Sequence, residues 1–257
     1  MKSILKYILL SGTRDRVYLG LFISLIVTFS LSIFLGSTAL VEQQQMTTAY
    51  ISGLSRGVLV VGTILFVCLS INRAFENKEV EFILSKAISR QQFIFSYLAG
   101  FFIAVLLIII PLILAILLIT KTDKFGLLIW ALSLFFELMI VICFALLSSL
   151  ILKNSFSSII ATLGFYIISR LMGMFVMAIN LPAKISDTSL EFSANSFALV
   201  LKILSAIFPR LDLFGQSSWL NYGITDYGSL KIILFQSLIY IPLMIFMAFH
   251  DFKKKQF

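Results

Sequence analysis

Charged and metal-binding side chains are scarce in this sequence. Aspartate, glutamate, lysine and arginine together make up 12% of the 257 residues, and there is one histidine. That residue, His250, stands next to Asp251 at the end of an apolar run, which is typical of a membrane interface. The two cysteines, Cys68 and Cys143, lie inside apolar runs, so we expect them to be packing residues. The sequence therefore predicts no metal site and no catalytic residues, and argues against an enzyme.

Apolar residues are abundant instead. They account for 60% of the chain, and the mean hydropathy is +1.05. One soluble core has no room for that much apolar surface, so we expect a lipid bilayer to be the solvent. The net charge of +8 would suggest nucleic-acid binding in a soluble protein. In a membrane protein the same excess follows from lysine and arginine in cytoplasmic loops, so no nucleic-acid partner is expected.

Apolar runs of spanning length define the expected fold. Crossing the hydrocarbon core takes about 20 apolar residues as a helix, because every backbone amide must be hydrogen-bonded within the protein. Six runs meet this length: 17–39, 51–71, 93–120, 125–152, 156–179 and 232–249. The sequence thus predicts an all-α membrane protein, with residues 1–257 forming one transmembrane domain.

Lysine and arginine positions predict the orientation. With a cytoplasmic N-terminus, twelve of these residues lie inside: Lys2, Lys6, Arg14, Arg16, Arg73, Lys78, Lys86, Arg90, Lys153, Lys253, Lys254 and Lys255. Seven lie outside: Arg56, Lys121, Lys124, Lys184, Lys202, Arg210 and Lys231. Because positive residues gather on the cytoplasmic side, we expect both termini to be cytoplasmic.

Two segments outside the six runs have a distinctive pattern. Residues 1–10 place apolar side chains on one helical face, which favours a short helix in the membrane interface. Between the fifth and sixth runs, residues 197–208 form an apolar run too short to span. We expect an external helical hairpin or re-entrant structure there, with Trp219 and Tyr222 as interfacial anchors.

The loop between the second and third runs is amphipathic. Val80, Ile83 and Leu84 share one helical face, whereas Glu79 and Glu81 lie on the others. A solvated connector has no need of an apolar face. The pattern fits a helix that docks into a groove of a partner, or one that lies on lipid headgroups.

The sequence from Glu81 to Arg90, EFILSKAISR, resembles the cytoplasmic loop of permeases of the ABC-2 family, the type 2 ABC exporters. The matching positions are Ser85, Lys86, Ile88, Ser89 and Arg90. Ala87 stands where the family usually has proline, and Tyr97 where lysine is common. The sequence pattern resembles the family over about 20 residues. The number and order of the expected helices resemble it over nearly the whole chain.

The resemblance implies that this loop is a coupling helix, which docks onto a separate ATPase subunit and transmits its movement. The docking residues would be Glu76, Glu79, Glu81, Phe82, Ile83, Leu84, Ser85, Lys86, Ser89 and Arg90. The chain has no glycine-rich phosphate loop, so we expect ATP and magnesium on the partner and no cofactor here. The family also implies a second permease chain, identical or different, and a bacterial inner membrane.

Two charged residues lie inside the expected spans, Glu137 in the fourth and Arg170 in the fifth. Both are about 21 to 23 Å from the cytoplasmic ends of their helices, at about 1.5 Å per residue. An unpaired charge at that depth is costly, so we expect them to pair, or to face a polar cavity or another subunit. The pair fits a structural role as well as a substrate or gating role.

The functional expectation is therefore an ABC-2 exporter permease that works by alternating access, with an unidentified cargo. Two alternatives remain. One is an ion-coupled secondary transporter or channel that uses Glu137 and Arg170, and the other is a membrane assembly subunit that transports nothing.

Overall fold

The computed structural model describes residues 16–85, 89–152, 154–180, 199–205, 207–224 and 227–254. Within these ranges the chain is helical and has no strand. Six helices are long and apolar enough to cross a membrane: α2 (Arg16–Ser37), α3 (Gln43–Glu76), α5 (Arg90–Ile119), α6 (Lys124–Ile151), α7 (Ser155–Asn180) and α10 (Tyr227–Lys254). Each overlaps one of the predicted runs, so the prediction of an all-α, multi-pass membrane protein is confirmed.

Three short elements connect these helices: α4 (Glu79–Leu84), the 3-10 helix η1 (Leu211–Gly215) and α9 (Ser218–Tyr222). Residues 199–205 are also helical. The interfacial helix predicted for residues 1–10 lies outside the described residues, as do residues 181–198 of the predicted external hairpin.

Helix α3 is much longer than its apolar run. It begins at Gln43, eight residues before the predicted start at 51, and ends at Glu76. Its first turn is polar, and the hydroxyl groups of Thr47 and Thr48 donate to the carbonyl oxygens of Gln43 and Gln44 at 2.8 Å. A count of apolar residues misses such a turn, although the helix continues through it.

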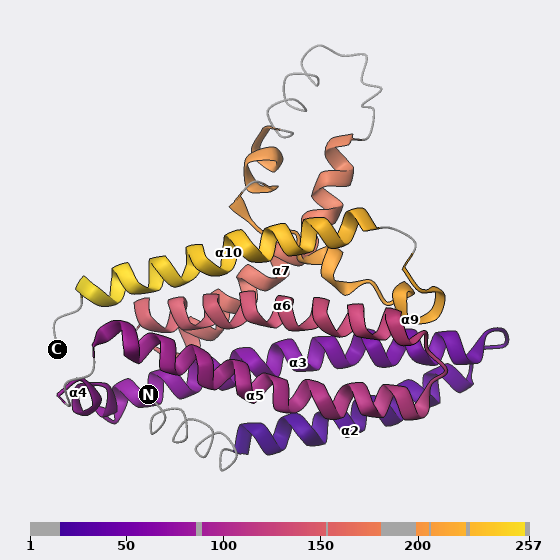
Figure 1. The fold of residues 1–257 in the computed structure, drawn as a ribbon, viewed down its shortest axis with the longest axis horizontal. Coiled ribbons are helices and arrows are strands. Elements are labelled where there is room, and N and C mark those ends of the chain that lie inside the picture. Colours follow the sequence, from indigo (N-terminus) through magenta and orange to yellow (C-terminus); the bar gives the residue numbers. More distant parts are fainter. Residues whose placement is uncertain are drawn as a thin grey trace.

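The long helices alternate in direction, and α6 lies in their middle (Figure 1). Helix α6 contacts α3, α5, α7, α9, α10 and η1. In its most apolar stretch 72% of residues are buried, against 22% to 56% in the other five spans. Helix α7 leaves the bundle towards its C-terminal end, whereas α4, the start of α5 and the end of α10 lie together at one end (Figure 1).

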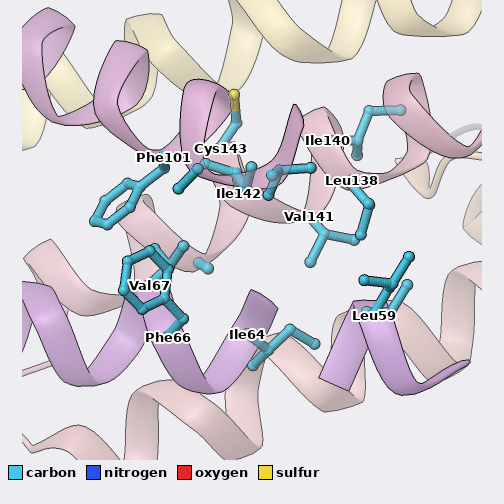
Figure 2. Packing of buried hydrophobic residues seen from close by; sticks show 14 of the residues in the cluster. Leu59, Ile64, Phe66, Val67, Phe101, Leu138, Ile140, Val141, Ile142 and Cys143 are labelled. Carbon is cyan, nitrogen blue, oxygen red and sulfur yellow. The ribbon is translucent and has the colours of Figure 1, made fainter. Parts of the chain in front are cut away.

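The apolar core joins α3, α5 and α6. Leu59, Ile64 and Val67 of α3 face Leu138 and Val141 of α6, and all are at most 1% exposed (Figure 2). Phe66 and Phe101 meet edge to face, with ring centroids 5.5 Å apart. Both cysteines are buried and free, as expected of packing residues.

The segment of η1 and α9 folds back onto the bundle. Leu211, Phe214 and Trp219 are at most 1% exposed, and the amide of Asp123 donates to the carbonyl oxygen of Leu220 at 3.0 Å. The prediction of Trp219 as an interfacial anchor is therefore wrong, because its ring packs inside the protein. Tyr222, in contrast, is 63% exposed.

Gly126 allows this contact. A Cβ atom at Gly126 would overlap the carbonyl oxygen of Trp219, which is backbone and has no rotamer to change. We expect Gly126→Ala to lower the thermal unfolding temperature in detergent, by overpacking that costs about 1–3 kcal/mol. Gly164→Ala is the control, since a Cβ atom at Gly164 meets nothing within 4 Å. It should be neutral or stabilising, and equal melting temperatures for the two variants would contradict this account.

Candidate functional site

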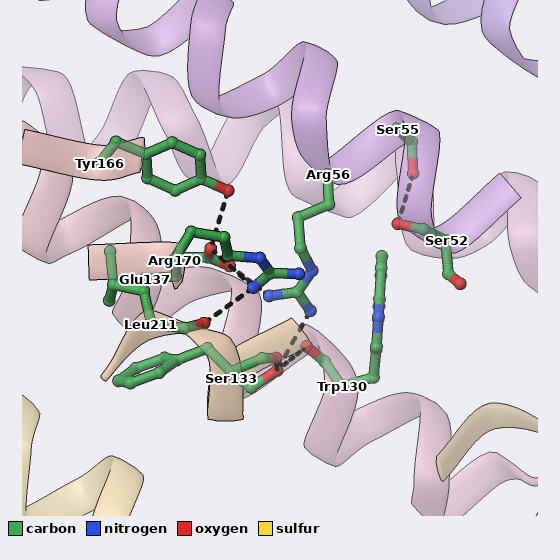
Figure 3. Close-up of polar contacts among 10 residues, drawn as sticks. Ser52, Ser55, Arg56, Trp130, Ser133, Glu137, Tyr166, Arg170 and Leu211 are labelled. Atoms are coloured by element: carbon green, nitrogen blue, oxygen red, sulfur yellow. Dashed lines mark hydrogen bonds and ion pairs between the residues drawn. The ribbon is translucent and has the colours of Figure 1, made fainter. Parts of the chain in front are cut away.

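Three helices bring charged side chains together in the interior of the bundle. Arg56 comes from α3, Glu137 from α6, and Tyr166 and Arg170 from α7 (Figure 3). Glu137 lies 14 residues before Ile151, and Arg170 lies 15 residues after the start of α7. These positions correspond to about 21 and 23 Å along the two helices. The cluster therefore lies far from the end of the bundle that holds α4.

The carboxylate of Glu137 is the centre of this cluster, and its side chain is 0% exposed. Oε2 accepts a hydrogen bond from Nη1 of Arg56. Oε1 accepts one from the hydroxyl of Tyr166 at 3.2 Å and lies 3.5 Å from Nη1 of Arg170. Both carboxylate oxygens are thus engaged, which a buried charge requires.

Arg56 is the residue that the sequence analysis missed. The count of positive residues places it on the external side, but it lies thirteen residues inside α3, with a side chain that is 3% exposed. Its Nη2 donates to Oγ of Ser133 at 3.3 Å, and its guanidinium carbon lies 5.1 Å from the centroid of the Trp130 ring. The predicted run 51–71 already contains Arg56 near its start, and the extension of α3 back to Gln43 places this third charge deeper within the helix. Without Arg56, the predicted orientation has six external positive residues against twelve cytoplasmic ones.

Arg170 is held by two groups. Besides Glu137, its Nη1 donates to the carbonyl oxygen of Leu211 at 2.8 Å. Its guanidinium also lies against Gly215, where a Cβ atom would overlap it. The side chain is 35% exposed, in contrast to the buried Arg56. Helix η1 thus fixes Arg170 at the edge of the cluster.

A separate ion pair lies beside the cluster. Nη2 of Arg210 is 2.9 Å from Oδ2 of Asp212, and the amide of Arg210 donates to Oε1 of Gln236 at 3.2 Å. The Asp212 carboxylate packs against Gly173, one turn beyond Arg170 on α7. This pair is neutral, so it does not change the charge balance of the cluster.

A neutral polar layer joins the same three helices nearer the α4 end. Nδ2 of Asn72 donates to the carbonyl oxygen of Cys68 at 2.8 Å and lies 3.5 Å from Oγ of Ser158. Oγ of Ser148 is 2.8 Å from Oγ1 of Thr162. Small hydroxyl and amide side chains of this kind bridge helices in membranes.

The predicted docking residues lie at the end of the bundle, on and around α4. Val80 is 1% exposed and Ile83 is half-buried, so both pack on this chain's own helices. Phe82 is 62% exposed, and Glu81 is exposed as well. The predicted apolar face of α4 therefore packs on the bundle, and the opposite side of the helix is exposed.

The other predicted docking residues differ in their surroundings. Glu76, Ser85 and Ser89 are exposed, Glu79 is half-buried, and Lys86 and the side chain of Leu84 lie outside the described residues. Ser89 forms a capping box with Gln92 at the start of α5. Nη1 of Arg90 donates to the carbonyl oxygens of Phe252 and Lys253 at 2.9 and 2.8 Å, which joins α5 to the C-terminal end of α10.

No model of a known protein family matches this chain, and no curated protein is significantly similar to it. The resemblance in residues 81–90 and the layout of the helices therefore carry the functional argument, together with the geometry described above.

The cluster of Arg56, Glu137 and Arg170 predicts that two arginine substitutions restore the stability of a Glu137→Gln variant to different extents. Glu137→Gln leaves two arginines without their carboxylate, and we expect a loss of roughly 3 kcal/mol or more in unfolding free energy. Adding Arg56→Gln should restore most of it, because Arg56 is the buried partner and Arg170 reaches the surface. Adding Arg170→Gln should restore less. Thermal unfolding of the single and double variants in detergent measures this, and equal rescue by the two arginine changes would contradict it.

Proposed function

We propose that this chain is the membrane-spanning permease subunit of an ATP-binding cassette exporter of the ABC-2 type. The six apolar helices and the resemblance of residues 81–90 to the coupling loop of that family support the proposal. ATP and magnesium bind to a separate ATPase subunit, and a second permease chain completes the transport path.

The main support for the proposal is that α4 packs one face on the bundle and exposes the other. Its inner face, with Val80 and Ile83, is fixed to the bundle, while Phe82 and Glu81 face outwards. Large aromatic side chains that fill a partner's pocket dominate binding energy in many interfaces. Phe82 is therefore the anchor for the ATPase, and the exposed carboxylates of Glu76 and Glu81 pair with basic residues on the rim of its groove.

Helix α3 connects α4, the proposed docking site (dock) for the ATPase, to the charged cluster. It continues without interruption from Arg56 to Glu76, twenty residues or about 30 Å, and α4 begins after two intervening residues. A force on α4 therefore acts on the helix that holds the Arg56–Glu137 pair. Arg90 adds a second connection, because it joins the start of α5 to the end of α10. ATPase closure would thus move α3, α5 and α10 together.

The buried charges also suit an ion-coupled secondary transporter that works without an ATPase. Glu137, however, accepts hydrogen bonds at both oxygens from side chains of two neighbouring helices. A transported cation would have to compete with these donors for the carboxylate, which favours a positioning role for the cluster. Transport by the purified chain under an ion gradient alone would support this second function.

The docking test uses two phenylalanines of similar exposure. Phe82 is 62% and Phe156 is 67% exposed, and Phe156 lies at the start of α7, where the chain returns from the same end of the bundle. We expect Phe82→Ala to weaken binding of an ABC ATPase that co-purifies with this chain at least tenfold, because truncating an interface anchor costs about 2 kcal/mol. Phe156→Ala should bind normally.

Affinity is measured with both proteins purified and the permease in nanodiscs. Equal affinities for wild type, Phe82→Ala and Phe156→Ala would contradict docking through α4. A permease that binds no ATPase at all would contradict the proposed function itself.

A further inference from the structure

The charged cluster carries an excess positive charge. Arg56 and Arg170 contribute two positive charges, and Glu137 contributes one negative charge. The neighbouring pair of Arg210 and Asp212 is neutral and adds nothing. Among the described residues, one positive charge is therefore left over at a depth where the surroundings are apolar, and such charges in membrane proteins mark functional sites.

This excess charge is located on Arg170. Arg56 is buried against Glu137, Ser133 and Trp130, so its charge is balanced inside the bundle. Arg170 approaches Glu137 and the carbonyl oxygen of Leu211 through the same atom, Nη1, and its side chain is 35% exposed. The backbone at Gly215 lies so close to the guanidinium that a Cβ atom there would overlap it, which holds the group in place.

The surface around Arg170 is apolar and adaptable. Ile167, Met174 and Met177 lie three residues before and four and seven residues after it, on the same helical face. They are 54%, 68% and 74% exposed. Methionine side chains are unbranched and flexible, and they suit surfaces that bind apolar ligands of varied shape. This part of α7 also leaves the bundle (Figure 1).

We propose that Arg170 and the methionine face of α7 bind an amphipathic anion, a molecule with one negatively charged group on an apolar body. The guanidinium pairs with the anionic group, which cancels the excess charge, and the apolar body lies along Ile167, Met174 and Met177 from the side of the membrane. The charge sets the ligand class, because a neutral or cationic amphiphile leaves Arg170 unbalanced.

The inference rests on the proposed function only in naming this anion as the cargo class. Binding itself needs no ATPase. Phe82→Ala should therefore bind the anion as wild type does, so the two proposals fail separately.

The test uses the purified full chain in phosphatidylcholine nanodiscs with three spin-labelled probes of equal chain length. These are an alkyl sulfate, which is a monoanion at any working pH, the matching alcohol and the matching alkylammonium. We expect the sulfate to show a motionally restricted population, with an affinity at least tenfold higher than that of either other probe. Arg170→Gln should lower sulfate affinity to that of the alcohol, and Arg170→Lys should retain part of it.

Two control measurements separate the role of Arg170 from misfolding and from general surface charge. Arg170→Gln leaves Glu137 paired with Arg56 and Tyr166 in a neutral cluster, so the variant should fold. Lys231→Gln removes an exposed positive charge from the first turns of α10 and should not change sulfate affinity. Equal affinities for the sulfate and the alcohol, or an unchanged preference in Arg170→Gln, would overturn the proposal.

A second copy of this chain is the competing occupant of the same face. Oxidation of the Met174→Cys variant tests it, because the native Cys68 and Cys143 are buried. We expect no cross-linked dimer when the sulfate is bound. A dimer that forms equally with and without the sulfate would show that the face is a subunit interface, and would overturn the proposal.

Discussion

The buried carboxylate of Glu137 is the constraint on which the arrangement of the helices depends. A carboxylate with no exposed surface is tolerated in a membrane protein only when donors surround it. Arg56 donates to it from α3 and Tyr166 from α7, and Arg170 of α7 adds an ion pair. Helices α3, α6 and α7 are thereby fixed relative to one another at one depth, and a neutral layer of serine, threonine and asparagine joins them again nearer α4.

The same interactions explain why residues 211–222 lie against the bundle. The carbonyl oxygen of Leu211 accepts from Arg170, and that of Phe214 is 2.9 Å from Oγ of Ser133, which in turn contacts Arg56. Gly126 and Gly215 provide the space for this approach. The charged cluster therefore shapes a connecting segment as well as the spanning helices. It also links the proposed dock to the proposed cargo face, since α3 runs from Arg56 to α4 and α7 carries Arg170.

Much of this fold follows from hydropathy, because six apolar runs leave a helical bundle as the only way to satisfy the backbone in a membrane. The depth of Glu137 and Arg170 also follows from counting residues along helices. Arg56 is the sixth residue of the predicted run 51–71, where a charge is easily counted with the external residues, and only the extension of α3 back to Gln43 shows how far inside the helix it lies. The burial of Trp219 and the inward face of α4 could not be predicted either. Both depend on which helix lies beside them, and amphipathicity alone does not say whether a face meets lipid, a partner or the same chain.

A photo-reactive amino acid in place of Phe82, compared with the same group in place of Phe156, tests the central claim most directly. The experiment is performed in the native membrane, with cross-linked partners identified by mass spectrometry. Docking through α4 predicts a cross-link from position 82 to a protein that carries a phosphate-binding loop, and none from position 156. Cross-links from position 82 only to lipid, or to this chain itself, would contradict the docking of an ATPase on α4.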